Sequence, residues 1–456
     1  MRILKSITAG LSLAALPAAT GLFAQTIDFT PTAASMTMAL TGDSIITQRL
    51  APYKEPQFLQ MIELIRGADV AFTNFEMLFH DYEGFPSAVS GGTYMRAEPA
   101  LAKELAWAGI DVVGLANNHT GDYSHESIVT TAKALEDVGI VHAGTGANLQ
   151  QAREARYADT PAGRVAVVSA SSSFPVHSRA GHQRSDVHGR PGLNPLRFTT
   201  TYYVTEASIA QLKALAGQVG AAPGNNPNEI TFMTNRFVAA AEPRVETVPL
   251  PEDFEAIKAS IRDAKTMSEY VIMSVHSHEA APGDRFAPAQ FFRTFAHGAI
   301  DAGASTVVGH GPHYLKGIEI YKGKPIFYSM GDFIFQNDTV LRLPADNYEP
   351  YNLDSTARIS DFNARRYNND TSGFPANPMI WESVVAMPVY KGDKLTELKL
   401  HPITLGYGKP SGRRGRPMLA DPVLGKKIID DLIKFSAPYG TKITYQDGVG
   451  IVEIPQ

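Results

Sequence analysis

Short apolar runs alternate along this chain with longer segments in which apolar residues recur every three to four positions. This alternation of strand-like and helix-like segments is typical of α/β proteins. The apolar runs predict strands at 36–40, 70–73, 112–116, 140–142, 165–169, 230–234, 271–275, 306–308 and 326–329. The periodic segments predict helices at 57–67, 99–108, 124–138, 206–216, 253–268 and 288–302.

Two stretches, 171–197 and 343–378, show neither the short apolar runs of strands nor the apolar spacing of helices. We expect them to be long irregular loops in a domain spanning 25–410, either functional lids or disordered inserts. A periodic segment at 421–435 and an interrupted apolar run at 443–454 predict a helix and a hairpin in a C-terminal extension, 411–456.

Five of the predicted strands end in polar residues that can bind metal ions. The clusters are Gly42-Asp43, Asn74-Phe75-Glu76, Asn117-Asn118-His119, His276-Ser277-His278-Glu279 and Gly309-His310-Gly311-Pro312-His313. Each alone also fits a strand-ending turn, a helix cap or a buried histidine. Because ligands collect at the carboxyl ends of strands in α/β proteins, five together predict one shared site. The chain has no cysteine, so a metal there would have only oxygen and nitrogen ligands.

The net charge and the first residues limit the expected partners and the expected location of the protein. The net charge of −5 excludes a global basic field, so we expect no nucleic-acid partner. Arg2 and Lys5 precede an apolar run at 7–16 and small residues up to Ala24, the pattern of a secretory signal peptide spanning 1–24. A membrane anchor is the weaker alternative, since the run falls short of the ~20 residues needed to span a bilayer. The sequence therefore predicts export to the periplasm or the extracellular space.

The strand-end motifs resemble those of the capsule-synthesis protein CapA family. The matching motifs are the five clusters above, Arg49, Asp122 and the segment Pro325-Ile326-Phe327-Tyr328-Ser329-Met330-Gly331-Asp332-Phe333. The resemblance spans about residues 36–405. It links the chain to poly-γ-glutamate and to the calcineurin-like metallophosphoesterase superfamily. It implies an α-β-β-α fold, a two-sheet β-sandwich flanked by helices, that holds one or two divalent ions such as Mn²⁺, Zn²⁺, Fe²⁺ or Mg²⁺.

The same resemblance implies roles for individual residues. The implied metal ligands are Asp43, Glu76 as the bridging carboxylate, Asn118, His276, His310 and His313. His119 would be the general acid, with Asp122 as the carboxylate that orients it. Arg49 would clamp a phosphate or carboxylate, or else form a surface salt bridge.

Two residues depart from the family pattern. Ile45 stands where the superfamily usually has a histidine two residues after the first aspartate, so the first metal lacks one ligand. Asp332 stands where the family usually has asparagine, and it adds a carboxylate near the site.

These observations predict an exported metal-dependent hydrolase acting on a phosphoester or on an anionic polymer. Metal-activated water attacks carbon as well as phosphorus, so γ-glutamyl amide links stay open as targets. The alternative is a non-hydrolytic component that binds or assembles poly-γ-glutamate, working with capsule-synthesis membrane proteins. The basic residues of 171–197 and Arg413, Arg414 and Arg416 would then contact an acidic polymer, or be solvated surface charge.

Overall fold

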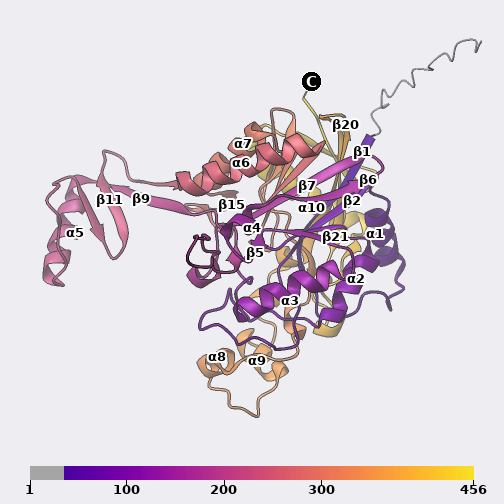
Figure 1. The fold of residues 1–456 in the computed structure, drawn as a ribbon, viewed down its shortest axis with the longest axis horizontal. Coiled ribbons are helices and arrows are strands. Elements are labelled where there is room, and N and C mark those ends of the chain that lie inside the picture. Colours follow the sequence, from indigo (N-terminus) through magenta and orange to yellow (C-terminus); the bar gives the residue numbers. More distant parts are fainter. Residues whose placement is uncertain (1–34, 456) are drawn as a thin grey trace, which may run out of the picture. The chain divides into compact units, whose positions relative to one another are not determined.

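The computed structural model describes residues 35–455, and the signal peptide predicted at 1–24 lies outside them (Figure 1). The described residues contain several β-sheets and helices, which confirms the predicted α/β class. None of the described helices has the length and apolar character needed to cross a membrane.

The first large sheet carries three of the five strand ends named above. Its strands are β1 (Ser35–Ile45), β2 (Val70–Phe75), β3 (Val112–Gly114), β4 (Val141–Ala143), β19 (Asp332–Phe335), β20 (Glu382–Lys391), β21 (Lys394–Thr404), β22 (Met418–Leu419), β23 (Ile443–Gln446) and β24 (Val449–Val452). Strands β1, β2, β3, β4 and β19 run parallel, so their carboxyl ends share one edge. The C-terminal hairpin joins this sheet through the pairing of β24 with β21.

The second sheet carries the other two strand ends. Its strands are β6 (Arg156–Thr160), β7 (Gly163–Ser171), β13 (Tyr270–His276), β16 (Thr306–His310), β17 (Ile318–Tyr321) and β18 (Lys324–Phe327). Strands β7, β13, β16 and β18 run parallel, and His276 lies opposite His310 in the β13–β16 register. Both histidines therefore end neighbouring strands at one level.

One apolar core joins the two sheets, since Leu40 and Phe72 of the first belong to the same buried cluster as Val167 and Ile272 of the second. Helices cover the outer faces. They are α1 (Pro56–Arg66), α2 (Ala102–Ala108) and α3 (Ser124–Glu136) beside the first sheet, and α6 (Pro251–Met267) and α7 (Gln290–Ala302) beside the second. The helix α10 (Pro422–Ser436) packs near β21 and β23.

A third, smaller sheet was only partly predicted. It consists of β9 (Phe198–Val204), β10 (Glu229–Phe232), β11 (Asn235–Ala239) and β12 (Arg244–Pro249), with α5 (Glu206–Gln218) packed on it over a separate apolar cluster. Figure 1 shows α5, β9 and β11 together. The sequence predicted α5 and β10 but not the other strands, which are rich in Thr and Arg and half buried at most places.

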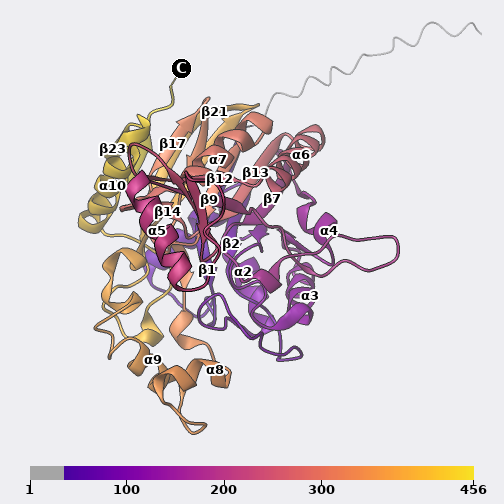
Figure 2. The same cartoon turned by 90° about the vertical axis from the view of Figure 1, so that its left-hand side faces the viewer.

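The stretch 343–378, expected to be an irregular loop, contains α8 (Ala345–Tyr348) and α9 (Ile359–Arg366), which lie together in Figures 1 and 2.

Arg414 fixes this insert. Its guanidinium is buried and pairs with Asp338 at 2.6 Å and with Asp370 at 2.8 Å. Arg416 is also buried and pairs with Glu55 at 3.0 Å. These two arginines are therefore buried ion-pair partners and not a solvated basic loop.

The remaining described elements are short. They are α4 (Leu149–Arg153), the pair β5 (Thr145–Gly146) and β8 (Gly192–Leu193), and the pair β14 (Ala280–Ala281) and β15 (Asp284–Pro288). The first pair ties the 171–197 segment to the chain after β4.

Gly42 allows β1 and β19 to meet closely at the candidate site. A Cβ at position 42 would lie 1.9 Å from the carbonyl oxygen of Gly331. Asp43 donates its backbone N–H to that same oxygen at 2.9 Å, and the register places Asp43 opposite Asp332. The close approach thus positions two buried carboxylates side by side.

We predict that Gly42→Ala lowers the free energy of unfolding by about 1–3 kcal/mol, because the backbone of one strand must move. Urea unfolding in EDTA measures this change. Gly217→Ala is the matched control, since open space surrounds Gly217 in α5 and alanine should stabilise that helix by roughly 0.5–1 kcal/mol. Equal unfolding midpoints for Gly42→Ala and the wild type would contradict the close approach.

Candidate metal centre

Glu76 lies at the centre of the site, just beyond the end of β2. Its side chain is fully buried, and neither carboxylate oxygen has a hydrogen-bond partner among the described residues. Burial, together with the charges of Asp43 and Asp332, raises the pKa of Glu76 well above its usual value. A buried carboxylate without partners is unfavourable by several kcal/mol unless a cation or a proton neutralises it.

Two groups of side chains converge on Glu76. Asp43, Glu76 and His313 form one, and Glu76, His276 and the exposed His278 form the other. In each group, one donor atom per residue lies within 4.8 Å of the others. Glu76 belongs to both, which is the arrangement of a carboxylate bridging two ions.

The distances between these atoms suit ligands of a common ion. His313 Nδ1 lies 3.8 Å from Glu76 Oε2 and 3.9 Å from Asp43 Oδ2. His276 Nε2 lies 3.7 Å from Glu76 Oε1 and 3.0 Å from His278 Nε2. Most of these separations are too long for hydrogen bonds. With metal–ligand distances near 2.1 Å, two ligands of one ion lie roughly 3–4 Å apart.

Asp43 is held rigidly at the bulged end of β1. Asn74 Nδ2 donates to Asp43 Oδ1 at 2.6 Å, and the backbone N–H of Gly311 donates to Oδ2 at 2.9 Å. The same Asn74 Nδ2 lies 3.2 Å from His276 Nδ1, so it links the two sheets at the site. His313 has a left-handed backbone with φ of 63°, a strained conformation that often marks functional sites.

Asn118 and His310 lie at the same edge but outside the two groups. Asn118 donates from Nδ2 to the carbonyl of Gly91 at 2.9 Å, while its buried Oδ1 has no partner among the described residues. His310 is fully buried with both ring nitrogens likewise unpartnered, and burial lowers its pKa to about 3. Both retain free donor atoms of the type that a divalent ion binds.

His119 and Asp122 form a second unit beside Glu76. His119 Nδ1 lies 2.7 Å from Asp122 Oδ2, and His119 Nε2 lies 3.7 Å from Glu76 Oε1. Asp122 also accepts the backbone N–H groups of Gly91 and Met95, at 2.9 and 2.8 Å. A carboxylate only accepts, so His119 donates from Nδ1 and presents Nε2 towards Glu76.

A cavity of about 190 Å³ opens beside these groups. It is lined by Ile45, Gly91, Gly92, Thr93, Met95, Asn118, His119, His278, Pro312, His313, Phe335, Asn337, Arg366 and Phe374. Arg366 comes from the end of α9, where it donates a hydrogen bond to the hydroxyl of Thr93. This cation was missed by the sequence reading, because α9 lies in a stretch without apolar periodicity.

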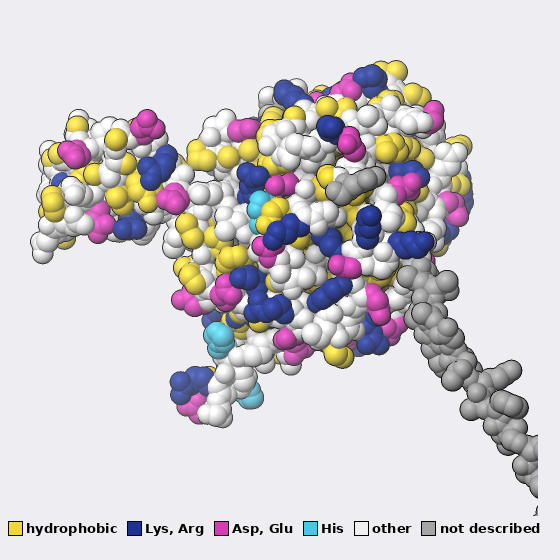
Figure 3. All heavy atoms as spheres, turned by 90° about the horizontal axis from the view of Figure 1, so that it is seen from above, with side chains coloured by type: hydrophobic (Ala, Val, Ile, Leu, Met, Phe, Trp, Pro, Cys, Tyr) yellow, Lys and Arg dark blue, Asp and Glu magenta, His cyan; other side chains and the backbone are white. Residues whose placement is uncertain are grey.

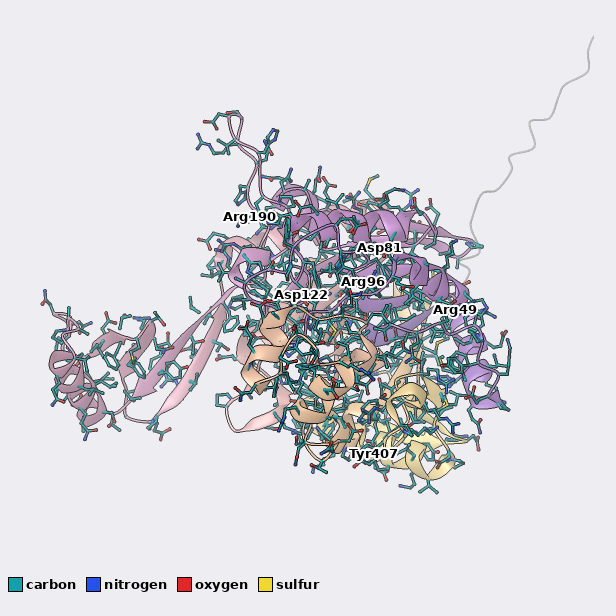
Figure 4. The ribbon with its side chains drawn as sticks, turned by 90° about the horizontal axis from the view of Figure 1, so that it is seen from below. Arg49, Asp81, Arg96, Asp122, Arg190 and Tyr407 are labelled. Atoms are coloured by element: carbon teal, nitrogen blue, oxygen red, sulfur yellow. The ribbon has the colours of Figure 1, made fainter. Side chains whose placement is uncertain are left out.

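Arg49 is not among the residues that line the cavity. Its side chain is 69% exposed and pairs with Glu104 at 2.8 Å. Figure 4 shows Arg49 well apart from Asp122. The structure thus corresponds to the salt-bridge alternative for Arg49 and offers Arg366 as the cation at the site.

The basic residues of 171–197 form no continuous positive patch in the structure. Arg184 pairs with Asp186 at 2.8 Å, and Arg190 donates to the carbonyl of Arg179 at 2.9 Å. Figure 3 shows positive and negative side chains interspersed over the face that it draws. His177 lies 3.2 Å from the carbonyl of Gly121, so the segment packs against the turn that carries Asp122.

Comparison with known proteins gives consistent similarities. The family model described as "Bacterial capsule synthesis protein PGA_cap" matches residues 37–337. An uncharacterised protein of Sinorhizobium fredii is 36% identical, over 92% of this chain and 93% of its own length. A "Capsule biosynthesis protein CapA" of Bacillus anthracis is 23% identical over 66% of this chain and 60% of its own. A "PGA biosynthesis protein CapA" of Bacillus subtilis is 39% identical over 19% and 22%.

Because the carboxylates of the site are buried, we expect the free energy of unfolding of the metal-free protein to depend on pH. Burial raises the pKa of Asp43 to about 7, against the opposing charge of His313 and with help from Asp332. Between pH 4 and 7 the folded state therefore holds more protons at Asp43 than the unfolded state, and this contribution to stability falls as pH rises. The buried histidines His276, His310 and His313 act oppositely, because their lowered pKa values favour folding at higher pH.

Comparing the wild type with Asp43→Asn cancels the histidine contribution to first order. We expect the free energy of unfolding of Asp43→Asn, minus that of the wild type, to increase from pH 4 to pH 7 in EDTA. Urea unfolding at each pH measures the difference. Lost hydrogen bonds from Gly311 and Asn74 add a constant offset, so a difference that stays flat or declines with pH would contradict the prediction.

Proposed function

Because the chain belongs to the bacterial capsule synthesis protein PGA_cap family, we propose that it is an exported metal-dependent hydrolase of the metallophosphoesterase type. It acts in poly-γ-glutamate or capsule polymer metabolism, in keeping with the Bacillus relatives, whose names refer to capsule biosynthesis and PGA biosynthesis. Export is supported by the secretory pattern of residues 1–24. The observation that carries the proposal is Glu76, a buried carboxylate shared by two groups of metal-binding side chains beside His119.

The layering of the fold supports the superfamily assignment. Two mixed sheets share one core, with helices outside, and the candidate ligands lie at the carboxyl ends of parallel strands in both sheets. Asp43, Glu76 and His313 would hold one ion, and Glu76, His276 and His278 the other, with Asn118 and His310 available beside them. Bound divalent ions would neutralise substrate oxygens and make water a stronger nucleophile.

His119 supplies the proton in this proposal. Asp122, fixed by two backbone N–H groups, holds the ring through Nδ1. This leaves Nε2 at the cavity, where a proton on it can pass to the leaving oxygen. Histidine is the side chain that most often transfers protons in enzymes.

Arg366 recognises the anionic group of the substrate. Arg366 lines the same cavity as His278 and His313, and its guanidinium carbon lies 6.0 Å from the ring centre of Phe374. Phe374 packs edge-on against His313, with ring centres 5.4 Å apart. A cation and an aromatic wall beside the metal centre suit an anion attached to an apolar or extended chain.

The test of hydrolysis uses protein stripped with EDTA and reloaded with Mn²⁺, Zn²⁺ or Mg²⁺. We expect metal-dependent cleavage of a nitrophenyl phosphodiester. Bound ions without turnover on phosphodiesters or γ-glutamyl peptides would refute hydrolysis. Salt-sensitive binding of poly-γ-glutamate by the same inactive protein would then favour the polymer-handling alternative.

His119→Gln should lower kcat by roughly 10²–10⁴-fold without changing the metal content, because glutamine cannot deliver the proton. The loss should be larger for a phosphodiester with an alkyl leaving group than for the nitrophenyl ester, since nitrophenolate leaves without protonation. Steady-state kinetics on both substrates measure the contrast. Equal losses on both would show that His119 is not the general acid.

Arg366→Gln should raise KM by roughly 10–100-fold, the loss of one charge-assisted contact of about 1.5–3 kcal/mol, with a smaller effect on kcat. Arg365→Gln is the matched control, because Arg365 precedes Arg366 in α9 and is exposed. The control should keep the wild-type KM. If both variants behave alike, Arg366 does not contact the substrate.

A further inference from the structure

We propose that Asp332 is a direct ligand of the ion bound by Asp43, Glu76 and His313, replacing the histidine that is absent at Ile45. The resulting site has three carboxylates and one imidazole and takes Mn²⁺. This inference rests on the metal centre of the proposed function.

The strand arrangement brings Asp332 beside Asp43 and His313. Asp332 begins β19 and lies opposite Asp43 in the parallel register with β1. It is fully buried, and its Oδ2 has no hydrogen-bond partner among the described residues. Its Oδ1 lies 2.9 Å from His313 Nδ1, the atom that faces Asp43 and Glu76.

His313 Nδ1 cannot donate a hydrogen bond to Asp332 and bind a metal ion at the same time. If it donates a proton to Asp332, it has no lone pair left for the ion. If it binds the ion through its lone pair, then Nδ1 and Asp332 Oδ1 are two acceptors 2.9 Å apart. Such a pair is favourable only when a cation lies between them, and 2.9 Å matches two neighbouring ligands with metal distances near 2.1 Å.

Position 45 cannot supply the missing ligand. The side chain of Ile45 packs in the apolar cluster of the first sheet and also lines the cavity, but it is a hydrocarbon and has no atom that can bind an ion. Ile45 pairs with Phe335 in the same two strands that pair Asp43 with Asp332. The ligand therefore comes from the neighbouring strand instead of from two residues further along β1.

The two ion sites then differ in chemistry. Asp43, Glu76 and Asp332 give the first site mostly carboxylate ligands, which suit Mn²⁺ and Mg²⁺. His276 and His278 give the second mostly imidazole ligands, which suit Zn²⁺ and similar ions. The shared Glu76 joins an oxygen-rich site to a nitrogen-rich one.

Asp332→Asn tests the inference, because asparagine keeps the shape and still accepts a hydrogen bond from His313 but loses the charge. Mn²⁺ binding, followed by calorimetry and by electron paramagnetic resonance, should show two ions in the wild type. In Asp332→Asn one ion should bind on the order of 100-fold more weakly. His278→Asn is the matched control and should weaken the other ion instead.

The unfolding temperature gives an independent readout, because the substitution should affect it in opposite directions in EDTA and in the response to Mn²⁺. In EDTA, Asp332→Asn should unfold at the same temperature as the wild type or higher, because one of three crowded carboxylates is gone. With Mn²⁺, its gain in unfolding temperature should be smaller. A variant that is less stable in EDTA and binds Mn²⁺ normally would overturn the inference and leave Asp332 a structural partner of His313.

Failure of this inference is distinguishable from failure of the proposed function. Two bound ions without hydrolysis would refute the hydrolase and leave the role of Asp332 intact. Hydrolysis together with unchanged Mn²⁺ affinity in Asp332→Asn would refute the ligand and leave the hydrolase.

Discussion

The crowding of three buried carboxylates is the constraint on which this structure depends. Asp43, Glu76 and Asp332 are all fully buried, and Glu76 has no hydrogen bond to offset its burial. Two aligned sheets and a glycine-permitted contact between strands are needed to keep these groups so close. Such close carboxylates are stable only where protons or a cation neutralise their charge, and burial keeps the surrounding imidazoles mostly neutral.

Much of the fold was predictable because its central strands are short, apolar and fully buried, so their composition alone distinguishes them from the helices. The third sheet was not, since half-buried strands such as β9 have neither an apolar run nor a clean alternation. The helices α8 and α9 were missed for a related reason. Their residues are largely polar, so their sequences show no strong apolar face. The ion pairs of Arg414 with Asp338 and Asp370 hold this segment to the rest of the protein instead.

The sequence indicated which side chains lie together where a polar residue stands at or just after the end of a strand, as for Asp43, Glu76 and His276. Sequence could not give the partner of each ligand across strands, because that depends on register. The role of Asp332 is an example, since only the pairing of β19 with β1 places it against Asp43. The sequence also could not show which arginine lies at the cavity. Only the structure shows that Arg49 pairs with Glu104 and that Arg366 lines the cavity.

Arg366 and Phe374 belong to the insert at 343–378, which lies beyond residue 337, where the match to the family model ends. The side chains of the candidate metal centre all lie before that point. Under the proposed function, the groups for the reaction and the cation for substrate recognition would therefore lie in separate segments of the chain. A change in the length or sequence of the later segment would then alter which anion is bound and leave the candidate metal centre unchanged.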